Sequence, residues 1–375
     1  MEENSAYNRI VIIGNGFDMA MGLKTSYSDF LLDYLKHRLN AATDTVVDNS
    51  LVQINRNGIS YRNSRFYAEK ASDTSTLEEL LNFMKNNSNY CKVTYRGILA
   101  DILSFHEIQN WVDIESLYFD SMVPMIDRLK NSPPKNKSYS NIEILNKSFR
   151  ELTNNLDDYI HKVNDNPLGQ NIADHFYDFL ELCVKKQTNK QTCLNHKADY
   201  NQLENPENVL FLNFNYTNSL NKILGYNGLN PKYQIVNIHG QAGKKSNPII
   251  FGYGDDTHPK YNELEQENSD IPLEFIKSFY YNRTPDYHKM LGFMESNKYE
   301  VYIVGHSCGL SDRTLLKSIF EQDNCGSIKI FHRGSIEEHI KKNMAISRHF
   351  DDKQLLRKRV LPFDVHAIIP QANIA

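Results

Sequence analysis

The chain is poor in the residues that build disulfide-bonded, zinc-binding or membrane proteins. It has five cysteines in 375 residues and no paired Cys-x-x-Cys motifs, so neither a disulfide framework nor a zinc ribbon is expected. No apolar run approaches the roughly 20 residues that a membrane-spanning helix requires. The first residues, MEENSAYNRI, are polar and lack the apolar stretch of a signal peptide. We therefore expect a cytoplasmic protein with free thiols and no membrane contact.

A strong charge of one sign is also absent. The formal net charge is -4 at pH 7, which provides no general attraction to nucleic acid. The spacing from Cys193 to His196 resembles a pair of metal ligands, but no second pair completes a site. We therefore expect no bound metal and no nucleic-acid partner. Hydrophobic residues make up 40% of the chain, which predicts a folded core rather than disorder.

Short apolar runs recur along the chain, and polar or small residues follow them. The runs are Arg9–Gly14, Val209–Asn215, Gln234–His239, Ile249–Gly254, Val301–Gly305 and Ile328–His332. Apolar runs without alternation favour strands of a parallel sheet that is covered on both faces. The sequence therefore predicts an α/β fold with a Rossmann-like parallel sheet of about six strands. Such sheets bind ligands at the carboxyl ends of their strands.

A long segment of different character separates the first two predicted strands. Amphipathic patterns predict helices over Thr76–Asn86, Ile98–Phe105, Asn141–Val163 and Asn171–Lys186. Residues 40–75 are weakly patterned, and we predict no element there. The chain is thus divided into a nucleotide-binding α/β domain, residues 1–39 and 205–375, and a mainly helical insertion after the first βα unit, residues 40–204.

The stretch RIVIIGNGFDMAMG is the sharpest local signal, because a predicted strand runs into Gly14-Asn15-Gly16. Glycines at such a turn let a phosphate approach backbone N–H groups. The full dinucleotide fingerprint is incomplete, because Met19 occupies its third glycine position. A tight strand–helix turn explains the same residues. Asp18 would cap the following helix or bond a ribose, and capping is the simpler role; Ser26 would cap the helix Tyr27–Leu39.

Two predicted strands end in an amide and an imidazole. Asn215 follows the apolar run VLFLNF, and His239 follows QIVNI. An amide has a donor and an acceptor with which to hold a substrate or water, and an imidazole accepts a proton near neutral pH. Each residue alone is more simply a polar group that closes a strand. Together with the glycine turn, they indicate one crevice in which both would be catalytic.

A second turn follows the strand predicted at Val301–Gly305. Residues 305–309, GHSCG, match the G-x-S-x-G pattern of serine hydrolases, which would make Ser307 a nucleophile. No Asp-bearing strand end clearly precedes a later histidine, and no HGGG-like oxyanion loop occurs earlier. We therefore favour a turn that donates hydroxyl and backbone groups to a ribose or phosphate. Ser311 or Asp312 would then cap the helix Arg313–Gln322.

Six motifs in chain order carry a resemblance to a known family. They are GNGFDMAMGLKTSYSDFL, NWVDIES, NFNYTNSL, NIHG, IFGYGDD and VYIVGHSCGLSD. Together they resemble the AbiH-type bacteriophage abortive-infection family over nearly the whole chain. The resemblance implies an antiphage defence protein whose activation halts or kills the infected cell. The partners considered are a nucleotide, a phage protein as trigger, and a second copy of the chain.

That family is in turn distantly similar to sirtuin-type NAD-binding domains. Gly14-Asn15-Gly16 matches the sirtuin Gly-x-Gly turn, and Asn215 falls on the Asn of the Gln-Asn-Ile-Asp motif. His239 precedes a glycine, as the catalytic His of sirtuins does. Phe214 and Thr217 replace the Gln and the Asp of the motif. These departures and the missing Cys-x-x-Cys pairs argue against a deacylase.

The likeness implies hydrolysis of NAD, the only expected cofactor and here a substrate, to nicotinamide and ADP-ribose. Asn215 would orient the water or the nicotinamide ribose, and His239 would bond a ribose hydroxyl and act as base. The residues expected to contact the nucleotide are Gly14, Asn15, Gly16, Phe17, Asp18, Thr217, Gly305, His306, Ser307 and Asp312. The first three would carry the pyrophosphate on backbone N–H groups.

Two other classes of function stay open. Asp113 and Glu115 beside the only tryptophan, or Asp255 and Asp256 in GYGDD, could hold magnesium in a nuclease toxin. The protein could also sense a nucleotide without catalysis and bind a partner or phage protein through its helical insertion and the Lys/Arg-bearing tail Lys341–Arg359.

Overall fold

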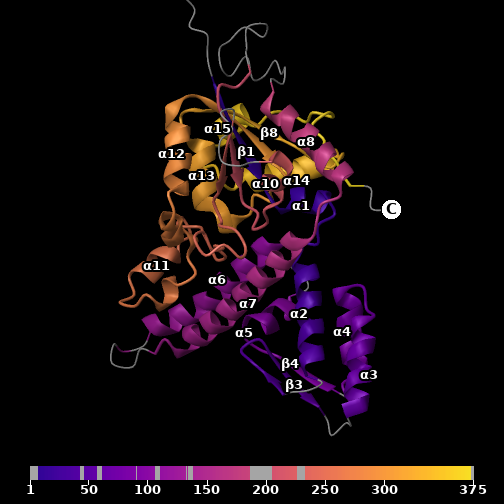
Figure 1. The fold of residues 1–375 in the computed structure, drawn as a ribbon. Coiled ribbons are helices and arrows are strands. Elements are labelled where there is room, and N and C mark those ends of the chain that lie inside the picture. The colour runs from indigo at the N-terminus through magenta and orange to yellow at the C-terminus, as the bar shows by residue number, and fades with distance from the viewer. Residues whose placement is uncertain are drawn as a thin grey trace, which may run out of the picture. The chain divides into compact units, whose positions relative to one another are not determined.

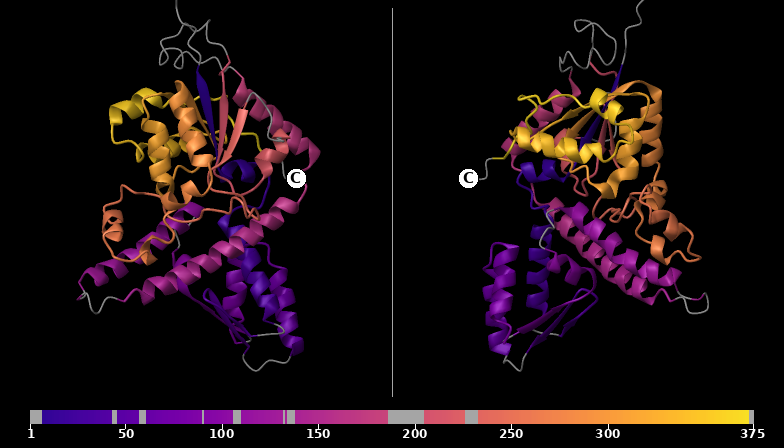
Figure 2. Two further views of the ribbon diagram at one scale, coloured as in Figure 1. Left: turned by 60° about the vertical axis from the view of Figure 1, so that its left-hand side comes forward. Right: turned by 180° about the vertical axis from the view of Figure 1, so that it is seen from behind.

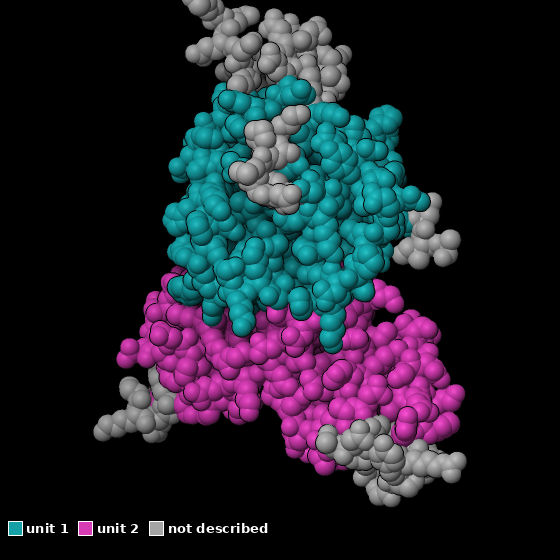
Figure 3. Space-filling model, in the orientation of Figure 1, with its two compact units in different colours: residues 1–23, 160–258, 276–375 teal, residues 24–159, 259–275 magenta. Residues whose placement is uncertain are grey.

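The computed structural model describes residues 7–42, 46–56, 61–89, 91–105, 110–131, 133, 138–185, 205–225 and 233–372 (Figure 1). The chain divides into two compact units, coloured separately in Figure 3. Unit 1 comprises residues 1–23, 160–258 and 276–375, and unit 2 comprises residues 24–159 and 259–275. The predicted domain boundaries at 39/40 and 204/205 stay a prediction. Cys193 and His196 lie outside the described residues.

Unit 1 is built on a five-stranded parallel sheet. The strands are β1 (Asn8–Ile13), β5 (Val209–Asn213), β6 (Tyr233–Asn237), β7 (Tyr299–Val304) and β8 (Cys325–Ile330). Their order is β6-β5-β1-β7-β8, so the chain moves in one direction from β1 to β6 and returns to the other side of β1 for β7. The point where the order reverses, between the carboxyl ends of β1 and β7, is where such sheets bind ligands.

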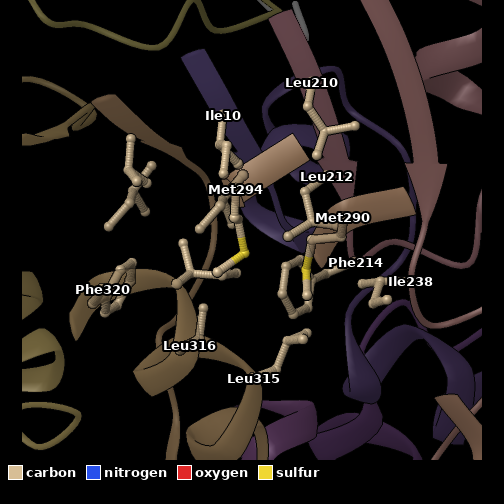
Figure 4. Close-up of a cluster of buried hydrophobic side chains, with 14 of the residues drawn as sticks. Ile10, Leu210, Leu212, Phe214, Ile238, Met290, Met294, Leu315, Leu316 and Phe320 are labelled. Carbon is tan, nitrogen blue, oxygen red and sulfur yellow. The ribbon is translucent and has the colours of Figure 1, made fainter. Parts of the chain in front are cut away.

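Helices cover both faces of this sheet. Helices α12 (Asp286–Ser296) and α13 (Arg313–Glu321) pack against one face, where Met290, Leu316 and Phe320 meet Ile10 and Leu212 (Figure 4). The opposite face is covered by α1 (Asn15–Ala20), α8 (Gln170–Val184) and α10 (Ser219–Leu224). Burial on both faces explains why the strands are apolar without alternation. The α/β class and the parallel sheet were therefore predicted correctly.

One predicted strand is wrong. Residues 249–254 do not join the sheet, and their one strand-type pairing is an isolated bridge between Tyr253 and Ile276. The run is apolar because it is buried as a loop beyond the strand ends, where the Ile250 amide donates to His239 O. A buried loop and a buried strand share the same composition, which is why the apolar run was misleading.

The rest of unit 1 consists of short elements and two C-terminal helices. These are η3 (Lys277–Arg283), η4 (Leu310–Asp312), α14 (Ile336–Ser347) and α15 (Lys353–Arg359). No helix in the described ranges is long and apolar enough to cross a membrane.

Unit 2 combines helices with a small antiparallel sheet of strand order β2-β3-β4. Its strands are β2 (Val47–Asp48), β3 (Val52–Arg56) and β4 (Cys91–Tyr95). Its helical elements are α2 (Tyr27–Ala41), α3 (Tyr61–Ser72), α4 (Leu77–Asn86), α5 (Gly97–Ser104), α6 (Trp111–Lys130), α7 (Ser140–Asp165, which ends in unit 1), α11 (Tyr261–Glu265) and η2 (Ile271–Leu273). The four helices predicted between residues 76 and 186 are confirmed within two residues at each end. The small sheet was not predicted, because its strands have at most five residues, too few for their alternation of apolar and polar side chains to stand out.

The predicted cap at Ser26 is confirmed. Its hydroxyl accepts from the Asp29 amide, and the Asp29 carboxylate accepts from the Ser26 amide. This reciprocal pair satisfies two amides that the first turn of α2 cannot pair by itself.

A buried ion pair ties β1 to β7 and to α8. Arg9 Nε donates to Glu300 Oε1 over 2.7 Å, and both side chains are almost completely buried. The same guanidinium donates to the backbone oxygens of Cys183 and Lys185 at the end of α8. One cation thus pairs a buried carboxylate and satisfies carbonyls that the last helical turn leaves open.

The Arg9→Met variant should therefore be strongly destabilised, because Glu300 would remain buried without its cation. We expect a loss of about 3–5 kcal/mol, measured by urea unfolding. The matched control is Arg65→Met, which breaks the exposed Arg65–Glu69 pair and should cost no more than about 0.5 kcal/mol. Equal losses in the two variants would contradict a structural role for the buried pair.

Candidate functional site

Asn215 lies two residues beyond β5, and its side chain is fixed by its donor group. Its Nδ2 donates to Gly14 O over 3.2 Å, and its backbone amide donates to Asn213 Oδ1 over 3.1 Å. No described residue hydrogen-bonds its Oδ1. Because a carbonyl oxygen holds the NH2 group, the amide presents its own oxygen as an acceptor beside the glycine turn.

Asp18 is buried beside Asn215 and does not cap α1. Its carboxylate accepts from the hydroxyls of Thr217, over 2.6 Å, and Ser219, over 2.5 Å. Burial raises the pKa of Asp18 to about 6, although the hydrogen bonds from Ser219, Thr217 and Asn215 lower it. The capping role predicted for Asp18 is thus wrong, because the carboxylate turns into the protein toward the residues after β5.

His239 lies two residues beyond β6 and faces Asp312. Its Nε2 is 3.3 Å from Asp312 Oδ1, slightly longer than an ordinary hydrogen bond. No described residue hydrogen-bonds its Nδ1. Burial, reinforced by the positive charge of Lys277, lowers the pKa of His239. The imidazole is therefore neutral at pH 7 and can accept a proton.

The Asp312 carboxylate is shared among three buried side chains. Lys277 Nζ donates to Oδ1 over 2.8 Å, and His306 Nε2 lies 3.6 Å from Oδ2. Burial alone would raise the pKa of Asp312, but Lys277 and His239 outweigh it and hold that pKa well below its usual range. Asp312 precedes α13 without a side-chain cap bond. The cap predicted for Asp312 is thus wrong, because the carboxylate is drawn to buried cationic and imidazole groups instead, whereas the cap predicted for Ser311 stays a prediction.

Phe214 separates the two imidazoles. Its ring centroid is 4.8 Å from that of His239 and 4.2 Å from that of His306. His306 Nδ1 accepts from the Cys308 amide over 3.0 Å, so its neutral ring carries the proton on Nε2, facing Asp312. Burial lowers the pKa of His306 to about 3 despite the opposing carboxylate. His306 is thus a neutral group whose two ring nitrogens are both directed at protein atoms.

The two glycine turns predicted from the sequence pack against each other. The Gly14 and Gly16 amides donate to Val304 O and Gly305 O, over 3.0 and 2.8 Å. A Cβ on Gly14 would lie 2.4 Å from His306 Cα, and one on Gly16 would lie 2.7 Å from Gly305 O. The glycines are therefore required for backbone contact between β1–α1 and the turn after β7. A role of their amides in holding pyrophosphate stays a prediction.

The turn after β7 has an unusual backbone. Gly305 has φ +69°, and Cys308, at φ +55°, is the one residue other than glycine with positive φ in the described part of the chain. Lys342 Nζ donates to His306 O, and His349 Nε2 lies 2.9 Å from Cys308 O. These contacts hold a left-handed conformation that a Cβ-bearing residue otherwise disfavours.

The remaining predicted nucleotide contacts fall into two groups. Asn15 and Ser307 are half-buried polar residues on the two abutting turns. Phe17 is fully buried and packs edge-on against Phe176, 5.3 Å between centroids. No described residue hydrogen-bonds the Ser307 hydroxyl, whereas a catalytic serine needs an adjacent base. This arrangement favours the turn interpretation over a serine nucleophile.

The carboxylates considered for magnesium are engaged elsewhere. Asp113 closes the capping box of α6 with the Asn110 amide. Asp255 accepts from Thr257, and Asp256 accepts from Ser278. Glu115 is buried. Among the described residues, no three histidine, cysteine or acidic side chains form a group that could hold a metal ion.

Sequence reasoning missed Lys277, Asn213 and Asn237. The side chain of Asn213 donates to Asn237 Oδ1 over 2.9 Å, which links the ends of β5 and β6. Both asparagines follow apolar runs and could have been found by the rule applied to Asn215. Lys277 lies in an aromatic-rich stretch, LEFIKSFYYN, which is consistent with burial but does not indicate which distant side chain a buried lysine would meet.

The sheet and the polar residues at its strand ends define an α/β protein with a candidate ligand site at a topological switch point. The chain matches the family model Bacteriophage abortive infection AbiH over residues 10–333. It therefore belongs to the AbiH family of abortive-infection proteins, which act against bacteriophage. No curated protein and no solved structure matches the chain.

The Gly14→Ala variant tests the contact between the two turns. Its Cβ would meet backbone at His306, which cannot rotate away, so we expect a loss of about 1–3 kcal/mol in urea unfolding. Gly292→Ala in α12 is the control, because nothing lies within 4 Å of its Cβ, and helix propensity predicts a gain of about 0.5–1 kcal/mol. A Gly14→Ala variant as stable as the wild type would refute the close approach.

The pH dependence of stability tests the burial of Asp18. Its pKa rises from 3.8 to about 6 on folding, so the folded state holds the proton more tightly. The contribution of Asp18 protonation to the free energy of unfolding is complete below pH 3.8. It is lost as pH rises through about 6. Between pH 5 and 7 the wild type should lose about 1 kcal/mol relative to Asp18→Asn. Parallel unfolding curves of the two proteins across this range would show that Asp18 is not buried.

Proposed function

We propose that this AbiH-family protein hydrolyses NAD to nicotinamide and ADP-ribose during phage infection, and that loss of NAD halts the infected cell. The observation that carries the proposal is the orientation of Asn215 and His239. Asn215 Nδ2 donates to Gly14 O, and His239 Nε2 faces Asp312 Oδ1 at 3.3 Å without hydrogen-bond geometry. Each keeps an acceptor, Oδ1 or Nδ1, that no described residue occupies.

The two acceptors suit the chemistry of the N-glycosidic bond. As the bond between the ribose carbon and the nicotinamide nitrogen breaks, positive charge develops on the ribose and nicotinamide leaves as a neutral molecule. A water then adds to the ribose carbon and releases one proton. Asn215 Oδ1 would orient that water by accepting one of its hydrogens, and His239 Nδ1 would take the released proton.

Asp312 and Lys277 would set the state of His239. An ionised carboxylate opposite Nε2 favours the tautomer with the proton there, which leaves the lone pair on Nδ1. Lys277 keeps the carboxylate ionised and, with burial, keeps the imidazole neutral. Asp312 is therefore proposed as a positioning residue, and its predicted contact with the nucleotide is not needed for this role.

The nucleotide contacts are proposed at the two abutting turns in a Rossmann-like, sirtuin-like arrangement. The Gly14 and Gly16 amides already donate within the protein, so the proposal assigns polar contacts to the side chains of Asn15 and Ser307. Gly305 and His306 shape the turn that carries Ser307. Thr217 would act through Asp18, to which its hydroxyl donates, and Phe17 would support the turn from the core.

The test compares the wild type with His239→Gln and Asn215→Ala in phage-infected cells and as purified protein. Without base or oriented water, nicotinamide release should fall by about 100-fold or more, and the fall in cellular NAD and the protection against phage should both disappear. His366→Gln is the control, because His366 is exposed, and it should behave as wild type. Thermal melting checks that each variant is folded.

Three outcomes would overturn the proposal in different ways. Protection that persists in folded His239→Gln and Asn215→Ala would indicate a binding protein without this chemistry. Protection with constant NAD and cleaved nucleic acid would indicate a nuclease, and EDTA would then abolish the activity. The proposed hydrolysis of NAD by Asn215 and His239 requires no metal, so EDTA should leave nicotinamide release unchanged.

A further inference from the structure

Helix α14 carries an apolar stripe on its exposed side. Ile336, Ile340 and Met344 are 48%, 46% and 57% exposed, and they recur at every fourth position. Residues spaced by four lie above one another on a helix. The stripe is therefore continuous over two turns of α14, the long yellow helix in the view from behind (Figure 2).

The other side of α14 is already used within unit 1. His339 and Ile346 are buried, and Lys342 reaches the carbonyl oxygen of His306. The helix therefore has an ordinary buried face and a second apolar face. Scattered exposed apolar residues need no explanation, but a contiguous row of three on one helix indicates a contact surface.

Opposite charges border the stripe on one side. Glu337 and Lys341 are both exposed and are four residues apart, so they lie one turn from each other along the same flank. When a second copy of α14 packs antiparallel against the first, the flank with Glu337 and Lys341 meets the same flank of the partner helix. Ile340 then meets Ile340 of the partner subunit, and Ile336 meets Met344 of the partner subunit.

The charges select this arrangement. When the two-fold axis passes beside Ile340, Glu337 of one subunit lies opposite position 343 of the other. Lys341 of the partner subunit is then only two residues away along the helix axis, about 3 Å at 1.5 Å per residue. The symmetry forms the same pair twice. A parallel arrangement would turn Glu337 toward the flank of Asn343 instead, which has no charge.

We propose that the protein self-associates through α14, with the stripe Ile336, Ile340 and Met344 packed antiparallel against the same stripe of a second copy. A two-fold interface of this kind is self-complementary and closes at two subunits. One helix on each side is a small interface, so the dimer is expected to be weak and to depend on concentration. This proposal does not rest on NAD hydrolysis.

Charge reversal tests the pairing by sedimentation velocity across a concentration series. Glu337→Lys and Lys341→Glu should each weaken the dimer by about tenfold or more, because each places like charges opposite each other twice. The double variant Glu337→Lys/Lys341→Glu should restore it. Glu295→Lys, an exposed change on α12, is the control and should leave the dissociation constant unchanged.

Cysteine cross-linking tests the register. In a Cys193→Ser background, oxidised Ile340→Cys should form a covalent dimer, whereas Ala345→Cys, on another side of α14, should not. The described native cysteines are buried and should not interfere. A monomer at every concentration, a dimer indifferent to the charge reversals, or equal cross-linking at both positions would each overturn the proposal.

Discussion

The candidate site depends on the contact of two backbone turns at the point where the strand order reverses. Because β1 and β7 are parallel neighbours, the residues that follow them leave the sheet side by side. Gly14 and Gly16 lack Cβ atoms, so the backbones of the two turns can touch. The Gly16 amide donates a hydrogen bond to Gly305 O. This contact places Gly14 O where it holds Asn215 and places His306 where it faces Asp312. The polar residues of three strand ends are thereby connected.

The buried charged side chains of Lys277, Asp312 and Asp18 determine the hydrogen bonding and protonation of the candidate site. Unit 1 buries Lys277 and Asp312 together, and their pairing explains how a carboxylate stays ionised away from water. Asp18 has hydroxyl and amide partners but no cationic partner among the described residues, and burial raises its pKa. Asn215 Oδ1 and His239 Nδ1 have no hydrogen-bond partner within the described ranges. Sites with these properties are where function concentrates in folded proteins.

The family membership and the two proposals rest on different observations. Membership of the AbiH family assigns the chain to abortive infection, whereas its chemistry is proposed from the strand ends. Self-association is proposed at α14, whose Lys342 also contacts the turn after β7. An interface on this helix would therefore lie one side chain away from the backbone of the candidate site, which offers a physical route by which assembly could influence it.

Local patterns determined the α/β class, the parallel strands, the cap of α2 and four helices between residues 76 and 186, because these depend on residues close in sequence. Helices α3 and α6 were not predicted. The ends of Val209–Asn215 and Gln234–His239 also indicated that Asn215 and His239 follow buried strands, since polar residues after apolar runs are visible without coordinates. The loop at 249–254 was mistaken for a strand, because burial alone gives both the same composition. Only the tertiary structure decided that Asp18 and Asp312 turn away from their helices, and that Lys277 is buried. Those outcomes depend on charges brought together from distant segments, and no local spacing encodes the energy of such an encounter.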